Sequence, residues 1–113
     1  MVDPSRIQIV VKSIKNRRDK WCLSTRHKNL VTLVKLGVDQ ETVFDEIYQR
    51  LNWRDYISGP ESDNHIPAIP GDVWVFGMEV CDRLCYLKFQ DRPNGVIMWI
   101  SLHCAEYSLN FPY

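Results

Sequence analysis

Long apolar runs are missing from this chain. The longest one near its start, Ile9-Val10-Val11, is too short for the apolar core of a secretory signal. No stretch approaches the roughly 20 apolar residues of a membrane-spanning helix. The 113 residues are 45% apolar and 12% aromatic, which is typical of one folded domain, here residues 1–113. We therefore expect no membrane contact and a cytoplasmic protein.

Metal-binding spacings are missing as well. Neither CxxC nor HxxxH occurs, although the chain has four cysteines: Cys22, Cys81, Cys85 and Cys104. Without an export signal, these residues are expected to be free thiols in a reducing compartment, packed as small buried side chains. A zinc site that adds His65 or His103 is the alternative. The sequence predicts no metal and no cofactor.

The net charge of the whole chain is zero, but its two parts carry opposite net charges. Residues 1–36 hold nine Lys or Arg and two acids, which gives +7, and residues 37–113 hold five basic and twelve acidic residues, which gives −7. The basic segment predicts an anionic partner at one end of the molecule. The alternative is that the two segments neutralise each other across one folded surface.

Helical patterns occupy the first half of the chain. Asp3-Pro4 is typical of a helix start, and apolar residues follow at helical spacing up to Ile14. "KWCLST" predicts a short strand. "HKNLVTLVKLGV" predicts a helix that ends at Gly37, with an apolar stripe of Leu30, Leu33 and Val34.

Another helix is expected after Asp39, which is a suitable N-cap. Its buried face is predicted to consist of five residues at helical spacing: Val43, Phe44, Ile47, Tyr48 and Leu51. Residues 52–72 are rich in proline, glycine and turn formers, and we expect mostly loop there.

The second half changes to a period of two. "VWVFGMEV", "LCYLKF" and "VIMWISLHC" predict three strands, joined by turns at "CDR" and "DRPNG". Helices followed by such a meander predict an α+β fold. We expect a small antiparallel sheet of three to four strands, with the helices packed on one face.

Alternation along these strands predicts which residues the helices leave uncovered. Cys85, Leu87 and Phe89 are expected against the helices, and Leu84, Tyr86 and Lys88 on the opposite, open face. In the last strand, Ile97, Trp99, Ser101 and His103 are expected on the open face. The alternate residues of the same strand are expected to face the helices: Val96, Met98, Ile100, Leu102 and Cys104.

Tyr86, Lys88, Ser101 and His103 would thus lie together. Histidine exchanges protons near neutral pH, lysine stabilises a phosphate or an oxyanion, and tyrosine donates a hydrogen bond or stacks on a base. Glu106 follows closely enough to reach the same surface, as does Tyr107. The alternative is an ordinary solvated sheet face.

With these residues in place, the chain resembles the MqsR-type toxins of bacterial toxin–antitoxin systems, in the RelE-like group of messenger-RNA endonucleases. The resemblance covers residues from "KNLVTLVKLGV" to the end. It rests on "LGV", "RDYISGPESD", "GDVWVFGMEV", "CYLKF" and "SLHCAEYSLNFPY". It implies a RelE-like fold, a metal-independent endoribonuclease that inhibits translation, a cognate antitoxin protein and a messenger-RNA substrate.

The resemblance also implies site residues. The family's catalytic tyrosine corresponds to Tyr86 in "YLK", with Lys88 two residues on, and its basic residue on the last strand corresponds to His103. A family lysine after "RDYI" is replaced by Ser58, and the family's glutamine has no counterpart near Trp74 and Val75. These departures imply altered chemistry, with either His103 or Glu106 as the general base.

Further residues are candidates for RNA or protein contacts. Trp74 and Tyr107 are predicted to stack on bases, with core packing as the alternative for Trp74, and Ser101 is predicted to contact RNA. Asp63 and His65 would complete the site or merely form turns. A basic partner could recognise the acidic helix surface of Asp45, Glu46 and Asp55. The competing function is a non-catalytic module that docks another protein through its sheet edge or its Pro-rich loop.

Overall fold

The structure is a computed structural model, and it describes residues 2–64 and 66–113. The described part has three α-helices: α1 (Pro4–Lys15), α2 (His27–Leu36) and α3 (Gln40–Arg50). It has five strands: β1 (Trp21–Leu23), β2 (Tyr56–Glu61), β3 (Asp72–Val80), β4 (Arg83–Asp91) and β5 (Ile97–Cys104). Short 3-10 turns cover Arg18–Lys20 and Trp53–Asp55.

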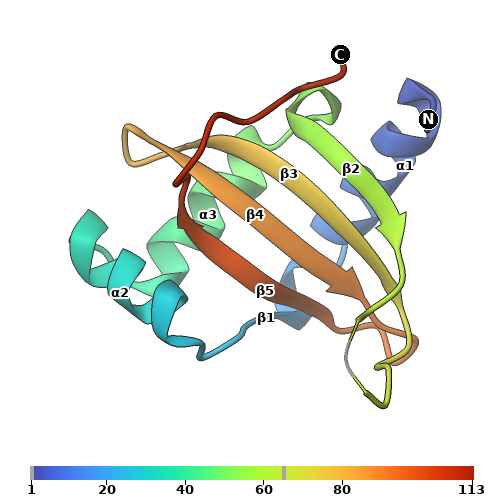
Figure 1. Cartoon of the computed structure of the whole chain (residues 1–113), viewed down its shortest axis with the longest axis horizontal. Coiled ribbons are helices and arrows are strands. Elements are labelled where there is room, and N and C mark those ends of the chain that lie inside the picture. Colours follow the sequence, from blue (N-terminus) through green and yellow to red (C-terminus); the bar gives the residue numbers. More distant parts are fainter. Residues whose placement is uncertain (1, 65) are drawn as a thin grey trace.

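The strands form one mixed sheet in the order β1-β5-β4-β3-β2 (Figure 1). β1 runs parallel to β5, and every other neighbouring pair is antiparallel. The α+β class is confirmed. The expectation of three to four antiparallel strands is wrong, because β1 and β2 extend the predicted meander at its two edges.

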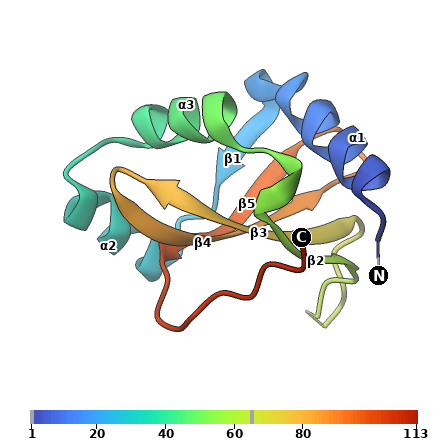
Figure 2. The same cartoon turned by 90° about the horizontal axis from the view of Figure 1, so that it is seen from above.

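The helices that cover the sheet are α1 and α3, which lie on one side of it (Figure 2). Asp39 caps α3 as predicted, since its side chain accepts a hydrogen bond from the Thr42 amide. The buried face of α3 is also as predicted, except that Tyr48 is 43% exposed. Below these helices the core holds a cluster of aromatic rings from both layers: Trp21, Phe44, Phe76, Phe89 and Trp99. We call the opposite side of the sheet the open face.

Residues 52–72 differ from the predicted loop, because β2 lies within them. Gly59 and Pro60 made this segment resemble a loop, yet both belong to β2. β2 is an edge strand, where a proline is tolerated because the missing amide faces away from the ladder. Its pairing with β3 is interrupted by two irregularities. At Gly59 a Cβ would lie 2.7 Å from the Val73 carbonyl oxygen, so the close approach of the two strands requires glycine.

A β-bulge in β5 changes the predicted alternation. Lys88 pairs with Ser101 and Phe89 pairs with Trp99, which leaves Ile100 as an extra residue. The prediction that Ile97 and Trp99 lie on the open face is therefore wrong, because both are fully buried in the core. Beyond the bulge, the pairing agrees with the prediction: His103 pairs with Tyr86, and both carry their side chains to the open face.

Helix α2 lies beside β5 and does not cover the core (Figure 2). Its predicted buried stripe is wrong for two residues, since Leu30 is 45% exposed and Val34 is 83% exposed. The buried side chains of α2 are instead polar, Asn29 and Thr32. An edge position explains this pattern, because Asn29 bonds to backbone groups of β5 while Leu33 and Leu36 pack only against the margin of the core.

The cysteines are free thiols, of which Cys85 is buried and Cys22 exposed. Over residues 2–64 and 66–113, no group of three or more His, Cys, Asp or Glu side chains is close enough to hold a metal ion. Within the same residues, no helix has the length and apolar character needed to cross a membrane.

Candidate functional site

Tyr86 and His103 are direct neighbours on the open face. They form a cross-strand pair of β4 and β5, and their rings stack with centroids 5.4 Å apart and planes 18° apart. The Nδ1 atom of His103 lies 3.1 Å from the carbonyl oxygen of Cys104. When Nδ1 donates its proton to this carbonyl, Nε2 carries a lone pair and can accept a proton.

The environment of Tyr86 favours its protonated form. Partial burial raises the pKa of the phenol, and the negative charge of Glu61 raises it further. The hydroxyl of Tyr86 is therefore a hydrogen-bond donor over the neutral pH range. Together, Tyr86 and His103 present a proton donor and a proton acceptor on adjacent strands.

Glu106 lies just beyond the end of β5. Its Oε1 atom is 2.6 Å from Nζ of Lys28 on α2, and both side chains are about half exposed. The hydrogen bond and charge of Lys28, with a smaller contribution from His103, lower the pKa of Glu106. A carboxylate held in this way is a weaker base than a free one. It lines a cleft of about 350 Å³ that Tyr86, His103 and Tyr107 also line.

Lys88 and Ser101 form the next cross-strand pair toward the other end of the open face. Lys88 is half-buried. Ser101 is 5% exposed, and its Oγ accepts a hydrogen bond of 3.1 Å from Nη1 of Arg26. Ser101 was predicted to contact RNA, but in the structure it anchors an arginine and has almost no surface of its own.

The two residues predicted to stack on bases, Trp74 and Tyr107, lie in different parts of the structure. Trp74 is 2% exposed and lies on the helix-covered face, where the guanidinium of Arg6 packs over its ring at 5.5 Å. The prediction that Trp74 stacks on bases is wrong, and core packing is its role. Tyr107 is 82% exposed beside the cleft of Glu106. Asp63 borders the open face, whereas His65 lies outside the described residues.

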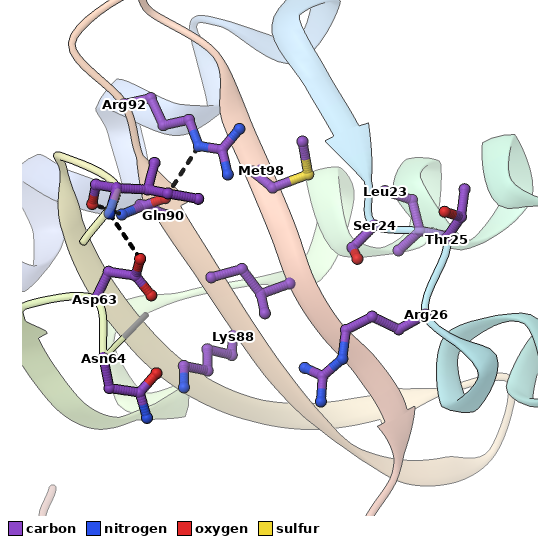
Figure 3. A pocket seen from close by; sticks show the side chains of 12 residues that line it. Leu23, Ser24, Thr25, Arg26, Asp63, Asn64, Lys88, Gln90, Arg92 and Met98 are labelled. Carbon is purple, nitrogen blue, oxygen red and sulfur yellow. Dashed lines mark hydrogen bonds between the residues drawn. The ribbon is translucent and has the colours of Figure 1, made fainter. Parts of the chain in front are cut away.

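A larger cleft of about 710 Å³ adjoins Lys88 (Figure 3). Its walls come from the turn between β1 and α2, from β4 and β5, and from the segment after β2. Twelve residues line it: Leu23, Ser24, Thr25, Arg26, Asp63, Asn64, Ile69, Lys88, Gln90, Arg92, Met98 and Ile100. Most of them were not singled out from the sequence, because β1 and β5 are far apart in the chain and meet only in the folded sheet.

The basic first third of the chain is divided between two surfaces. On the helix side and the adjoining sheet edge, Arg17 pairs with Asp91 at 2.9 Å, and Arg18 pairs with Glu41 and Asp45, each at 3.1 Å. These ion pairs support the alternative that the basic residues 1–36 and the acidic residues 37–113 neutralise each other across the folded surface. Around the open face lie other cations, Arg26 among them, that form no ion pair with a described residue.

The chain was compared with family models, curated proteins and solved structures, and no match was found. What the site can do is therefore inferred from its geometry.

Proposed function

We propose that this protein is a metal-independent messenger-RNA endoribonuclease. It would be the toxin of a bacterial toxin–antitoxin pair, of the MqsR type and with a RelE-like arrangement. The observation that carries the proposal is the placement of Tyr86, Lys88 and His103 side by side on the open face. A proton acceptor, a proton donor and an ammonium group in one place are what cleavage of RNA by its own 2′-hydroxyl requires.

The proposed reaction is a transfer of the phosphoryl group within the RNA. Nε2 of His103 takes the proton of the 2′-hydroxyl, and the 2′-oxygen forms a bond to phosphorus. The bond from phosphorus to the 5′-oxygen breaks, and the phenol of Tyr86 gives that oxygen a proton. Lys88 stabilises the charge that develops on the phosphorane. The products are a 2′,3′-cyclic phosphate and a 5′-hydroxyl end.

Between the two candidate bases, we favour His103. The ion pair with Lys28 holds Glu106 as a carboxylate and lowers its pKa, which makes it a weak proton acceptor. In this role Glu106 fixes Lys28 beside the imidazole and contributes to the shape of the cleft. Tyr107, exposed at the same cleft, remains the candidate for stacking on an unpaired base.

The proposal implies a cytoplasmic protein and a cognate antitoxin that blocks the site. The acidic surface of α3 is a less suitable contact for a basic partner than the sequence indicated. Asp45 is already paired with Arg18, and Glu46 with Arg50 at 2.7 Å. The proposed antitoxin contact is therefore the open face itself, where Arg26, Lys88 and Arg92 form no ion pair with a described residue.

The test is cleavage of single-stranded transcripts by the purified protein in EDTA, with and without ribosomes. His103→Ala is expected to slow cleavage by at least about 10²-fold, since it removes a positioned base. Lys88→Ala is expected to do the same. Lys12→Ala, at an exposed position of α1, is the matched control, and it should cut at close to the wild-type rate. Intact RNA under all these conditions, with folded protein, would contradict the proposal.

A non-catalytic docking module is the second candidate, and α2 is the observation that favours it. Val31 and Val34 of this helix are 44% and 83% exposed, which leaves an apolar strip at the surface. Growth of bacteria that express the chain alone separates the two functions. Growth arrest that His103→Ala abolishes supports the nuclease. Arrest that persists in His103→Ala but is lost in Val34→Ser supports docking.

A further inference from the structure

The larger cleft carries three cations that have no acidic partner among the described residues. Arg26, Lys88 and Arg92 all line it, and none forms an ion pair with a described residue. Asp63 is the single acid among the described residues of the lining, and its Oδ2 accepts a hydrogen bond of 2.8 Å from the Ile69 amide. Three positive charges around one concave surface favour an anionic ligand.

Both arginines are held in place by the sheet. Nη1 of Arg26 donates to Oγ of Ser101 at 3.1 Å. Figure 3 shows the corresponding bond of Arg92, whose Nε donates to Oε1 of Gln90 at 3.0 Å. Gln90 is 1% exposed, and its Nε2 donates to the carbonyls of Ile69 and Gly71. Each guanidinium therefore keeps further N–H groups in a fixed orientation, and such a group binds phosphate through two hydrogen bonds.

The floor of the cleft is apolar. Leu23, Met98 and Ile100 contribute half-buried side chains to it, and Ile100 is present there because the bulge in β5 adds a residue on this face. Ser24 and Asn64 add a hydroxyl and an amide to the rim. A volume of about 710 Å³ with an apolar floor and a few polar groups is typical of a site for a ring-containing small ligand.

We propose that this cleft binds the nucleotide that adjoins the scissile phosphate of a single-stranded RNA. Its base packs on Met98 and Ile100, and Arg26 and Arg92, at opposite ends of the cleft (Figure 3), each bind one of the two phosphates that flank it. Lys88 belongs both to this cleft and to the cross-strand ladder of Tyr86 and His103, so it connects the two parts of one substrate path. The inference rests on the proposed nuclease function, since it places the next nucleotide of the same substrate.

The methionines provide a direct test of the base contact. Met98 lies in the floor of the cleft, whereas Met78 is buried on the helix-covered face and serves as an internal control. The probe is a mixed-sequence RNA hexamer with 2′-O-methyl groups, which the protein cannot cut. In protein labelled with ¹³C at the methionine methyl groups, the hexamer should shift the Met98 signal and leave Met78 unchanged. An unchanged Met98 signal at saturating hexamer would overturn the proposal.

The arginines are tested by the affinity for the same hexamer, measured by fluorescence anisotropy at several salt concentrations. The double variant Arg26→Gln/Arg92→Gln is expected to bind at least about tenfold more weakly. Its slope of log affinity against log salt should be smaller by about 1.4, which is about 0.7 for each phosphate that the protein no longer neutralises. Arg83→Gln, at an exposed arginine at the start of β4, is the matched control and should bind like wild type. Equal affinity of the double variant and wild type would overturn the inference.

These measurements separate the inference from the proposed function, because the hexamer reports binding without cleavage. Binding that depends on the two arginines, together with no cleavage of any natural RNA, would support the nucleotide site and contradict the nuclease. Normal cleavage of RNA by the double variant would support the nuclease and contradict the nucleotide site. Polyglutamate that displaces the hexamer at equal charge would identify an acidic protein as the ligand and overturn the nucleotide assignment.

Discussion

At the scale of single residues, Asn29 shows how a polar side chain can serve as part of a sheet. It is 1% exposed, and its Nδ2 donates to the carbonyls of Ser24 and Ile100 at 2.9 and 3.0 Å. Its Oδ1 accepts from the amide of Leu102 at 2.9 Å. β1 stops pairing with β5 at Leu23, and the side-chain amide of Asn29 satisfies the β5 backbone groups beyond that point.

Asn29→Ala should therefore destabilise the fold by about 1–3 kcal/mol, because buried backbone groups of β5 lose their partners. The free energy of unfolding in urea measures this effect. Asn110→Ala, at an exposed position of the C-terminal tail, is the matched control and should stay within about 0.5 kcal/mol of wild type. Equal stability of the two variants would show that the hydrogen bonds of Asn29 to the β5 backbone do not stabilise the fold.

The same scale shows what can be predicted from the sequence. The open-face positions of Tyr86 and Lys88 follow from alternation within one strand, which depends only on neighbouring residues. Asn29 and Arg26 could not be recognised, because each acts on β5, more than 70 positions later in the chain. Trp74 is a related case: its position on the covered face follows from pairing with Phe89, and no composition rule reveals it.

At the scale of elements, the C-terminal tail after β5 crosses the open face (Figure 2). It passes over Gly77 of β3, where a Cβ would lie 2.7 Å from Cδ1 of Leu109 and 3.1 Å from Cζ of Phe111. Its last ring, Tyr113, packs against Trp53 and Tyr56, and its hydroxyl donates to the carbonyl of Val2. Glycine at position 77 thus leaves room for the tail to lie on the sheet.

Gly77→Val should push the tail off the sheet. We expect proteinase K, which cuts with little side-chain specificity, to cleave within the tail about tenfold faster in this variant, which corresponds to about 1.4 kcal/mol of easier local opening. Leu109→Ser/Phe111→Ser should have the same effect, because it removes the apolar side chains with which the tail contacts the sheet at Gly77. Ser108→Ala, in the same tail, is the control. Unchanged cleavage of the Gly77 and Leu109/Phe111 variants would show that the tail is not docked.

Elements differ in how well the sequence predicts them. β3, β4 and α3 have strong periodicity, and their positions are confirmed. β2 was missed because Gly59 and Pro60 are typical of loops, although an edge strand can hold both. The bulge in β5 was missed because an apolar residue such as Ile100 fits either face of a strand. The stripe of α2 was assigned to the core because an edge helix and a covering helix share the same period.

At the scale of the whole molecule, burial links the protonation of one thiol to global stability. Cys85 is fully buried between β3 and β5, and burial raises the pKa of its thiol to about 12, with Cys104 contributing. In the unfolded chain the thiol ionises near its ordinary pKa of about 8.5. The native state therefore holds a proton that the unfolded state loses, and stability declines between the unfolded and the folded pKa.

The free energy of unfolding should decline between about pH 9 and pH 11 by about 1.4 kcal/mol per pH unit from Cys85 alone. Cys85→Ala lowers stability at every pH through the cavity it leaves, but it should remove this part of the slope. Cys22→Ala, at an exposed thiol, should retain the wild-type slope. Urea unfolding under reducing conditions measures all three proteins. Parallel pH profiles for wild type and Cys85→Ala would contradict the assignment.

The position of β5 between β1 and β4 has a consequence for the synthesis of the chain. β1 is made early, but its partner in the sheet is among the last segments of these 113 residues to leave the ribosome. Contacts between such distant segments close late, because the intervening chain must first be ordered. His103 lies on that same late strand. A growing chain therefore cannot assemble the open face before translation has passed residue 104, and a stop before His103 yields a product without the proposed activity.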